Sequence, residues 1–273
     1  MSKLLYAGFY RLRKDKVFFG CLLIPPIYSV YVLVSQYMQM KESGGHYAVD
    51  SLLFHFLLLM GMLTSVFVSL YVGTEYHDGT IRNKLIGGSS RNSIYLSNLV
   101  ICCLVGTLNV LLTYSINFAI GLSLFGPVEM SAAKLIQTCI AGILLTLSYI
   151  SIFHVISMLS SDKTISAVSC ILLAVFLIVL AVGLFSKLIQ PEFIEQPIAG
   201  TEMALETVKN PAYLTGSVRS VYQNMLDFLP AGQSIQILNS ENTNLGRMIL
   251  YSLFIVIGTN IIGLGIFKRK DIK

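Results

Sequence analysis

Six long runs of apolar residues constrain the fold of this chain more than any other feature of its sequence. They cover residues 17–37, 52–74, 93–125, 132–159, 164–185 and 246–267. At about 1.5 Å of rise per residue, a helix of each of these lengths crosses the roughly 30 Å hydrocarbon core of a bilayer. Because hydrocarbon offers no water to backbone polar groups, such runs predict helices. The sequence therefore predicts an all-α, polytopic membrane protein in which residues 1–273 form a single transmembrane domain of six helices.

Charged residues are scarce, and their distribution predicts the orientation of the helices. Only 12% of the residues are charged and 55% are hydrophobic, which leaves too little polar surface for a water-soluble globule. Thirteen of the 19 Lys and Arg, but five of the 14 Asp and Glu, fall in segments that six helices place on one side. By the positive-inside rule that side is the cytoplasm, so both termini are predicted to be cytoplasmic. The same rule explains the net charge of +5 without a nucleic-acid partner.

The sequence lacks the motifs of several common enzyme classes. It contains no Gly-x-x-x-x-Gly-Lys-Ser/Thr phosphate loop, no His-Glu-x-x-His and no Gly-x-Ser-x-Gly. All five cysteines lie in apolar runs without zinc-ligand spacing, so we predict no metal site, no disulfide framework and no catalytic residue. The predicted spans also lack the carboxylates with which ion-driven carriers bind a coupling ion. Energy for transport is therefore predicted to come from another protein.

Residues 1–16 are predicted to form a basic amphipathic helix. One helical face consists of Leu4, Leu5, Gly8, Phe9 and Leu12, and lysines and arginines occupy the other faces. Such a helix lies in the membrane interface with its apolar side among the lipids. We therefore expect an interface helix on the cytoplasmic side, in contact with membrane lipids.

Residues 75–91 form a short polar, charged segment between the second and third apolar runs. Asp78 or Thr80 is suited to cap a helical turn there, and Gly87 and Gly88 are suited to end it. The apolar side of this turn is expected to consist of Ile81, Leu85 and Ile86. The segment therefore predicts a short cytoplasmic helix that lies across the membrane surface, where another protein can push it.

The order of residues in this segment resembles the cytoplasmic loop of type-2 ABC transporter permeases, the integral subunits of many bacterial exporters. The resemblance is carried by Glu75, Gly79-Thr80, Leu85 and Ser90-Arg91. It departs from the family pattern at Gly88-Ser89, where a proline is common, and near Asn98, where a lysine is common. In that family this loop is a coupling helix that docks on a separate ATPase. The resemblance implies ATPase-coupling roles for Glu75, Asp78, Gly79, Thr80, Ile81, Arg82, Leu85 and Arg91.

The resemblance also implies partners and a location. The chain is expected to pair with cytoplasmic ABC ATPase subunits, which bind ATP and Mg²⁺, and with a second copy or a similar permease in a bacterial cell membrane. It would then act in export of an amphipathic cargo such as an antimicrobial peptide, a drug or a lipid, with no cofactor of its own. The interface helix is expected either to touch the ATPase or to act only as an anchor. An alternative function is a non-transporting scaffold or sensor with an external ligand-binding loop, and residues 75–91 would then be a solvated loop that fixes topology.

Two stripes of residues in the predicted spans indicate close helix contacts. Small residues recur every fourth position in the second span, at Gly61, Ser65, Ser69 and Gly73. Polar residues recur at the same spacing in the third span, at Asn109, Thr113 and Asn117. Small residues let helices approach closely, and polar groups in hydrocarbon need partners. Both stripes are expected at helix–helix contacts. For the first stripe, one candidate contact is the seam of a dimer. The alternative for each stripe is a translocation path.

Residues 186–245 form the largest segment outside the apolar runs. This segment is acidic overall and contains four prolines, so it predicts a small external subdomain before the last helix. Its part 221–233 is similar to the re-entrant helical element that precedes the last span in type-2 permeases. The alternative for this part is a surface helix packed on the ends of the spans.

Overall fold

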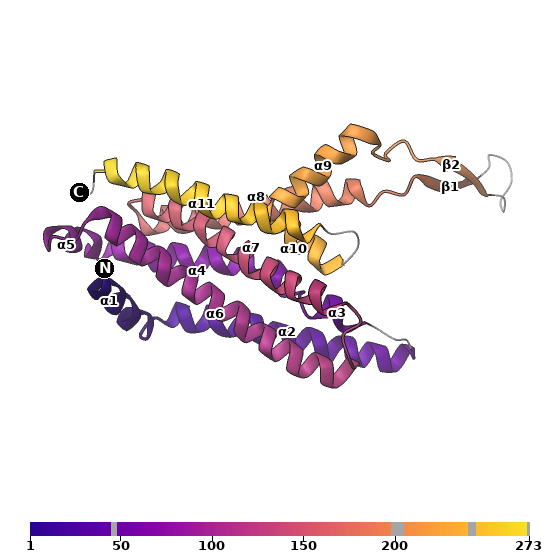
Figure 1. Cartoon of the computed structure of the whole chain (residues 1–273), viewed down its shortest axis with the longest axis horizontal. Coiled ribbons are helices and arrows are strands. Elements are labelled where there is room, and N and C mark those ends of the chain that lie inside the picture. Colours follow the sequence, from indigo (N-terminus) through magenta and orange to yellow (C-terminus); the bar gives the residue numbers. More distant parts are fainter. Residues whose placement is uncertain (45–47, 198–204, 240–243, 272–273) are drawn as a thin grey trace.

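The chain folds into a bundle of long helices that run side by side (Figure 1). The computed structural model describes residues 1–44, 48–197, 205–239 and 244–271, and 82% of it is helical. Among the described residues, six helical segments are long and apolar enough to cross a membrane. They are α2 (Lys16–Ser43), α3 with α4 (Val49–Leu52 and Leu57–His77), α6 (Arg91–Phe125), α7 (Ala132–Leu159), α8 (Lys163–Leu188) and α11 (Leu245–Arg269). The predicted all-α, six-span fold is confirmed.

Side-chain caps explain where several of these helices begin. The side chains of Asp15, Ser90 and Asp162 each accept a hydrogen bond from a backbone N–H in the first turn of α2, α6 and α8. Such caps satisfy donors that have no partner inside the helix. At the other end, α2 stops at Gly44, whose φ of +64° is unfavourable for residues with a Cβ. Helix α2 thus extends beyond residue 37, where the apolar run ended.

The small residues of α4 are buried within this one chain. A Cβ on Gly61 would lie 2.9 Å from the ring of Tyr149 in α7, and a Cβ on Gly73 would lie 3.1 Å from Cα of Lys163 in α8. Ser65 and Ser69 between them are also fully buried. The stripe therefore lets α4 pack closely between α7 and α8. It leaves no surface there for a second copy or for a cargo.

The polar stripe of α6 makes hydrogen bonds to neighbouring elements. Asn109 Nδ2 donates to the backbone oxygen of Cys21 in α2 at 2.7 Å, and Asn117 Nδ2 donates to that of Leu53 at 2.8 Å. Thr113 Oγ1 donates to the backbone oxygen of Asn109, one turn earlier in α6, at 2.9 Å. The two asparagine bonds fix α6 against α2 and against the turn between α3 and α4, whereas the Thr113 bond lies within α6.

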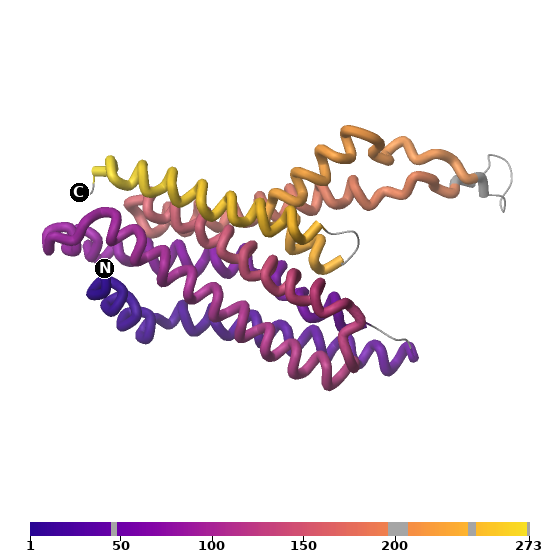
Figure 2. Tube along the Cα trace, viewed as in Figure 1, coloured from indigo at the N-terminus to yellow at the C-terminus, as the bar shows by residue number. Residues whose placement is uncertain are grey.

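Both described ends of the chain lie at one end of the bundle (Figures 1 and 2). The short helices α1 (Ser2–Leu12) and α5 (Thr80–Ile86) lie at the same end. By the charge distribution this is the cytoplasmic end. Helix α1 buries Gly8 and Leu12. A Cβ at Gly8 would lie 2.1 Å from Cδ1 of Ile101, so α1 packs closely against α6.

The opposite end carries a β-hairpin, which no pattern in the sequence predicted. Strands β1 (Phe193–Pro197) and β2 (Leu205–Lys209) pair antiparallel, with Phe193 opposite Lys209, and they extend beyond the helices (Figure 1). Asn210 secures the base of the hairpin, because its backbone N–H donates to the oxygen of Glu192 at 2.9 Å. The external segment therefore contains a small sheet as well as helices.

Two helices separate the hairpin from the last span. They are α9 (Gly216–Phe228) and α10 (Pro230–Asn239), and the break between them falls at Leu229, just before Pro230. Helix α9 is mostly exposed, whereas Pro230 to Ile237 of α10 are buried. The buried part of this segment is therefore α10. It begins at Pro230, near the end of the predicted element 221–233, and continues beyond that element.

Candidate functional site

A buried carboxylate lies at the cytoplasmic end of α4. Glu75 is 2% exposed, and its Oε1 lies 2.8 Å from Arg11 Nη1 and 2.5 Å from Lys84 Nζ. Its Oε2 accepts a hydrogen bond of 2.7 Å from Asn98 Nδ2. We call Glu75, Arg11, Lys84 and Asn98 the Glu75 cluster. Its members come from α4, α1, α5 and α6, so one carboxylate connects four helices.

Arg11 is held in this cluster by Tyr71, one turn before Glu75. The guanidinium lies over the Tyr71 ring, 3.8 Å from its centroid, and Nη2 donates to the Tyr71 backbone oxygen at 3.2 Å. The Tyr71 hydroxyl in turn donates to the backbone oxygen of Gly8 at 3.3 Å. Helix α1 is therefore attached to α4 by an ion pair, a cation–π contact and hydrogen bonds.

The backbone of α5 is shaped by glycines at both ends. Its N-cap is Gly79, with φ of +64° and no side-chain cap, so the prediction that Asp78 or Thr80 caps this helix is wrong. The Thr80 hydroxyl instead donates to the Glu75 backbone oxygen at 3.0 Å. At the other end, Gly88 has φ of +80°, as predicted for a glycine that ends a helix. Glycine permits the two sharp bends that turn α5 across the ends of α4 and α6.

Helix α5 has a buried face and an exposed face. Ile81 is buried and Leu85 packs against the core. Ile86 is 74% exposed, so the prediction that it shares the apolar side is wrong. We call the exposed residues Arg82, Asn83 and Ile86 the outer face of α5. Ile86 thus lies on the same exposed face as the polar side chains of Arg82 and Asn83.

Arg91 connects the start of α6 to the end of α11. Its Nη1 donates to the backbone oxygen of Phe267 at 3.1 Å and to that of Lys270. Lys270 Nζ donates to the Tyr76 hydroxyl at 3.0 Å and to the backbone oxygen of Met158 at 3.1 Å. Partial burial lowers the pKa of Lys270 to about 8, because desolvation disfavours the ammonium form. Arg91 and Lys270 thus join α4, α6, α7 and α11 inside the protein.

A pocket of about 410 Å³ lies beside the Glu75 cluster. It is lined by Tyr10, Arg11, Lys14, Asp15, Val17, Leu70, Thr74, Asp78 and Lys163. These residues come from α1, from the start of α2, from the cytoplasmic ends of α4 and α8, and from the short connections that follow α1 and α4. Three cations and two carboxylates line the pocket, namely Arg11, Lys14 and Lys163 with Asp15 and Asp78. The pocket therefore lies between α1 and the end of α4 and has no lining residue from α5.

The structure divides the predicted coupling residues into two groups. Asp78 and Arg82 are exposed, and Gly79 and Thr80 are partly exposed. The others, Glu75, Ile81, Leu85 and Arg91, are buried or make contacts within the chain. The first group can touch a partner directly, whereas the second can only position what the partner touches. Sequence reasoning missed Arg11 and Lys84, placed Ile86 on the wrong face, and noted Asn98 only as a departure from a pattern.

Within residues 1–44, 48–197, 205–239 and 244–271, no three His, Cys, Asp or Glu side chains are placed to hold a metal ion. The cluster at Glu75 contains one carboxylate and two cations. These opposite charges join α1, α4 and α5 at this end of the bundle.

Comparisons with known proteins bear on this arrangement. A family model described as ABC-2 family transporter protein matches residues 4–181. The match covers more than half of the chain and includes the whole Glu75 cluster and α5. It ends within α8, before the β-hairpin and α9 to α11. A comparison with curated proteins gives no match.

Proposed function

Because the chain belongs to the ABC-2 family of transporter proteins, and is thus a multi-pass membrane protein, we propose that it is the permease subunit of an ATP-driven exporter. The observation that carries this proposal is the position of α5, which is exposed on one face and joined to three other helices by Glu75 on the other. A helix of this kind is suited to receive a push from a cytoplasmic ABC ATPase.

In this proposal the ATPase binds the outer face of α5 and the neighbouring part of α1. ATP and Mg²⁺ are bound by the ATPase, and the permease contributes no cofactor. Removing one partner from a buried ion pair costs about 3–5 kcal/mol, so α5 is not expected to separate from Glu75 when it is pushed. The displacement would instead pass through Glu75 to α4, through Arg11 to α1 and through Asn98 to α6.

The contacts of Arg91 and Lys270 extend this path to the rest of the bundle. Arg91 begins α6, the helix that follows α5, and is bonded to the end of α11. Lys270 bonds to Tyr76 of α4 and to the end of α7. A push on α5 would therefore move the cytoplasmic ends of several spans together, as alternation between inward-open and outward-open states requires.

We propose that the cargo path lies between this chain and a second copy or a similar permease. The pocket beside Asn109, in the middle of the bundle, offers only about 10 Å³. That is about the least volume that a single water molecule needs, so this pocket is far too small for a cargo. The apolar faces of the spans favour an amphipathic cargo, such as an antimicrobial peptide, a drug or a lipid, and a bacterial cell membrane as the location.

The proposal is tested by purifying the tagged chain in mild detergent from its native cells. We expect an ATPase with a phosphate loop to co-purify in stoichiometric amount, and its ATP turnover to depend on residues 75–91. A chain that purifies alone, or with a partner that lacks ATPase activity, would contradict the proposal. That result would favour the alternative, a membrane scaffold or sensor with an external ligand-binding loop.

Ile86→Asp is expected to reduce ATPase retention on the purified chain at least tenfold. The carboxylate would place a charge in the centre of the proposed contact, where desolvating it is costly. Ile86 is exposed in the isolated chain, so its thermal midpoint should stay unchanged. The matched control is Ile86→Leu, which keeps an apolar side chain and should retain the ATPase. Equal retention by both variants would exclude the outer face of α5 as the contact.

A further inference from the structure

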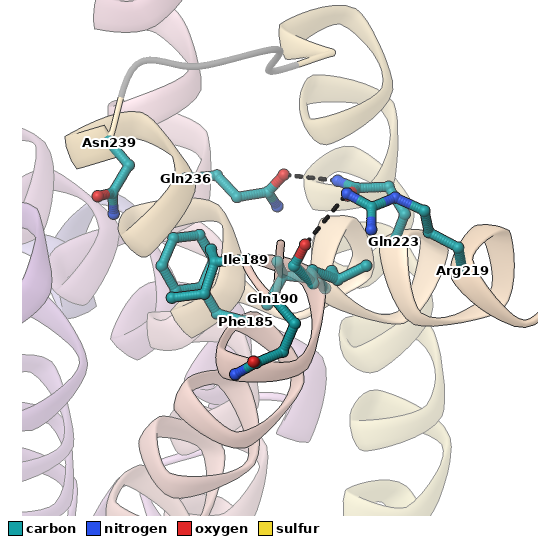
Figure 3. A pocket seen from close by; sticks show the side chains of 9 residues that line it. Phe185, Ile189, Gln190, Arg219, Gln223, Gln236 and Asn239 are labelled. Atoms are coloured by element: carbon teal, nitrogen blue, oxygen red, sulfur yellow. Dashed lines mark hydrogen bonds between the residues drawn. The ribbon is translucent and has the colours of Figure 1, made fainter. Parts of the chain in front are cut away.

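A polar pocket lies at the external end of the bundle, outside the part that the family model matches. Its volume is about 450 Å³, and it is enclosed by the end of α8 and by α9 and α10 (Figure 3). It is lined by Phe185, Leu188, Ile189, Gln190, Arg219, Gln223, Leu226, Gln236 and Asn239. Every one of these residues follows residue 181, where the match ends. The pocket is therefore a feature of this chain that the family match does not describe.

One donor in this pocket is a buried amide without a partner. Gln236 is 6% exposed, and its Oε1 accepts a hydrogen bond of 2.7 Å from Gln223 Nε2. Its Nε2 is buried and makes no hydrogen bond to any described residue. Buried amide nitrogens are nearly always paired in folded proteins, because leaving one unpaired costs free energy. The Gln236 amide is thus a donor that an incoming acceptor can satisfy.

The second donor belongs to Arg219. Its Nη2 donates to the backbone oxygen of Leu188 at 3.1 Å, and its guanidinium lies 5.2 Å from the centroid of the Tyr213 ring. Nη1 is buried and has no hydrogen-bond partner among the described residues. Figure 3 shows Arg219 and Gln236 reaching toward each other from α9 and α10, beside Phe185 and Ile189. Two unsatisfied donors, one of them cationic, therefore face the same space.

The carboxylate of Asp227 in α9, near the pocket, already has partners among the described residues. Asp227 Oδ2 lies 3.2 Å from Arg247 Nη1, and its Oδ1 accepts a hydrogen bond of 2.8 Å from Gln223 Nε2. None of the ion pairs found among the described residues involves Arg219. The positive charge of the pocket is thus available to an anion.

Besides the polar side chains of Gln190 and Asn239, the rest of the pocket wall is apolar. Leu188, Ile189 and Leu226 line it, and Phe185 borders both this pocket and a second one of about 300 Å³. The second pocket is lined by Leu58, Ile178, Val182, Phe185, Ala231, Ser234, Ile235 and Leu238. All of these except Ser234 are apolar. A cationic pocket beside an apolar one matches a molecule with an anionic head and a hydrocarbon chain.

We propose that this pocket binds the carboxylate or phosphate headgroup of a lipid-like amphiphile. Arg219 Nη1 and Gln236 Nε2 donate to the anionic oxygens, and the hydrocarbon chain lies against Phe185 and the second pocket. The site is independent of the exporter proposal, because it binds the same chemistry whether the amphiphile is a cargo or a lipid of the outer leaflet.

The test measures thermal unfolding of the purified full chain in a non-ionic detergent against increasing dodecyl phosphate. A ligand that binds the folded state raises the unfolding temperature in a saturable way. We expect saturable stabilisation, with the apparent affinity weakened at least tenfold by Arg219→Gln. The matched control is Lys187→Gln, which removes an exposed positive charge beside the pocket and should leave the affinity unchanged. Equal binding by wild type and Arg219→Gln would overturn the proposal.

Further ligands and variants separate the possible sources of the signal. Laurate in place of dodecyl phosphate distinguishes a carboxylate ligand from a phosphate ligand. Inorganic phosphate that binds as tightly as dodecyl phosphate would overturn the role of the apolar walls. Gln236→Glu keeps the shape of the side chain and its acceptor for Gln223, so it tests the site even when Arg219→Gln folds poorly. It should also weaken dodecyl phosphate binding, and unchanged binding would overturn the assignment of the amide.

Discussion

Glu75→Ala is expected to abolish ATP-driven transport and to lower the thermal midpoint of the purified chain by several degrees. The carboxylate is buried, and its removal leaves Arg11 and Lys84, which are 27% and 17% exposed, without their shared partner. The loss of one member of a buried ion pair costs about 3–5 kcal/mol, and the partial exposure of both cations favours the lower value. The measurements are cargo transport in vesicles and thermal unfolding of the purified chain.

The matched control for this variant is Asp78→Ala. Asp78 lies three residues later, carries the same charge and is exposed, so its removal should change the unfolding free energy by less than about 0.5 kcal/mol. A Glu75→Ala chain with an unchanged midpoint would contradict the structural role of Glu75. Combining Glu75→Gln with Arg11→Met gives a double-mutant cycle. A coupling energy near zero in that cycle would show that Arg11 does not depend on Glu75.

Gly232→Ala is expected to open the corner between α9 and α10. A Cβ at this position would lie 2.1 Å from the backbone oxygen of Leu226, and a backbone atom cannot rotate away as a side chain can. Overpacking of this kind typically costs about 1–3 kcal/mol and sometimes more. We expect a lower yield of folded chain, a lower thermal midpoint and loss of dodecyl phosphate binding, because Leu226 and Gln236 both line the pocket.

The control for Gly232→Ala is Gly183→Ala in α8. A Cβ at Gly183 would meet no atom within 4 Å, so the same change in composition should leave folding intact. It should also leave dodecyl phosphate binding intact. If Gly232→Ala matches Gly183→Ala in yield, thermal midpoint and binding, the prediction is wrong. That result would show that the corner between α9 and α10 can widen without loss of folding or of dodecyl phosphate binding.

The spans were predictable because hydropathy and helix caps are local properties. Asp162 begins α8 because its own side chain accepts from Ile165 N–H, three residues away. The Glu75 cluster was not predictable in this way, because Arg11 and Asn98 lie 64 and 23 positions from Glu75 in the sequence. Only the packing of α1, α4 and α6 brings them together. The charge of Glu75 was therefore recognisable from the sequence, but its burial was not.

Two other features show where local patterns are insufficient. Helix α5 has seven residues, so Ile81, Leu85 and Ile86 could not all be assigned to one face by period alone. Helix α10 begins Pro-Ala-Gly-Gln-Ser, and no local pattern in these residues decides between the re-entrant element and the surface helix that the sequence left open. The helix is buried because Gln233 Nε2 donates to the backbone oxygens of Asp227 at 2.9 Å and Met248 at 3.2 Å. Long-range hydrogen bonds satisfy its polar groups, and a local pattern does not reveal such bonds.

The positions of the contacts at the cytoplasmic end also determine the order in which that end assembles during synthesis. All four members of the Glu75 cluster lie within the first 98 residues, whereas Arg91 needs the backbone oxygens of residues 267 and 270. At roughly 5–20 residues per second, the ribosome adds the intervening chain in a time on the order of ten seconds or more. For that interval the guanidinium of Arg91 lacks its acceptors on α11, and Tyr76 lacks Lys270. The nascent protein therefore passes through a stage in which the Glu75 cluster can form but the contacts of Arg91 and Tyr76 with the end of the chain cannot.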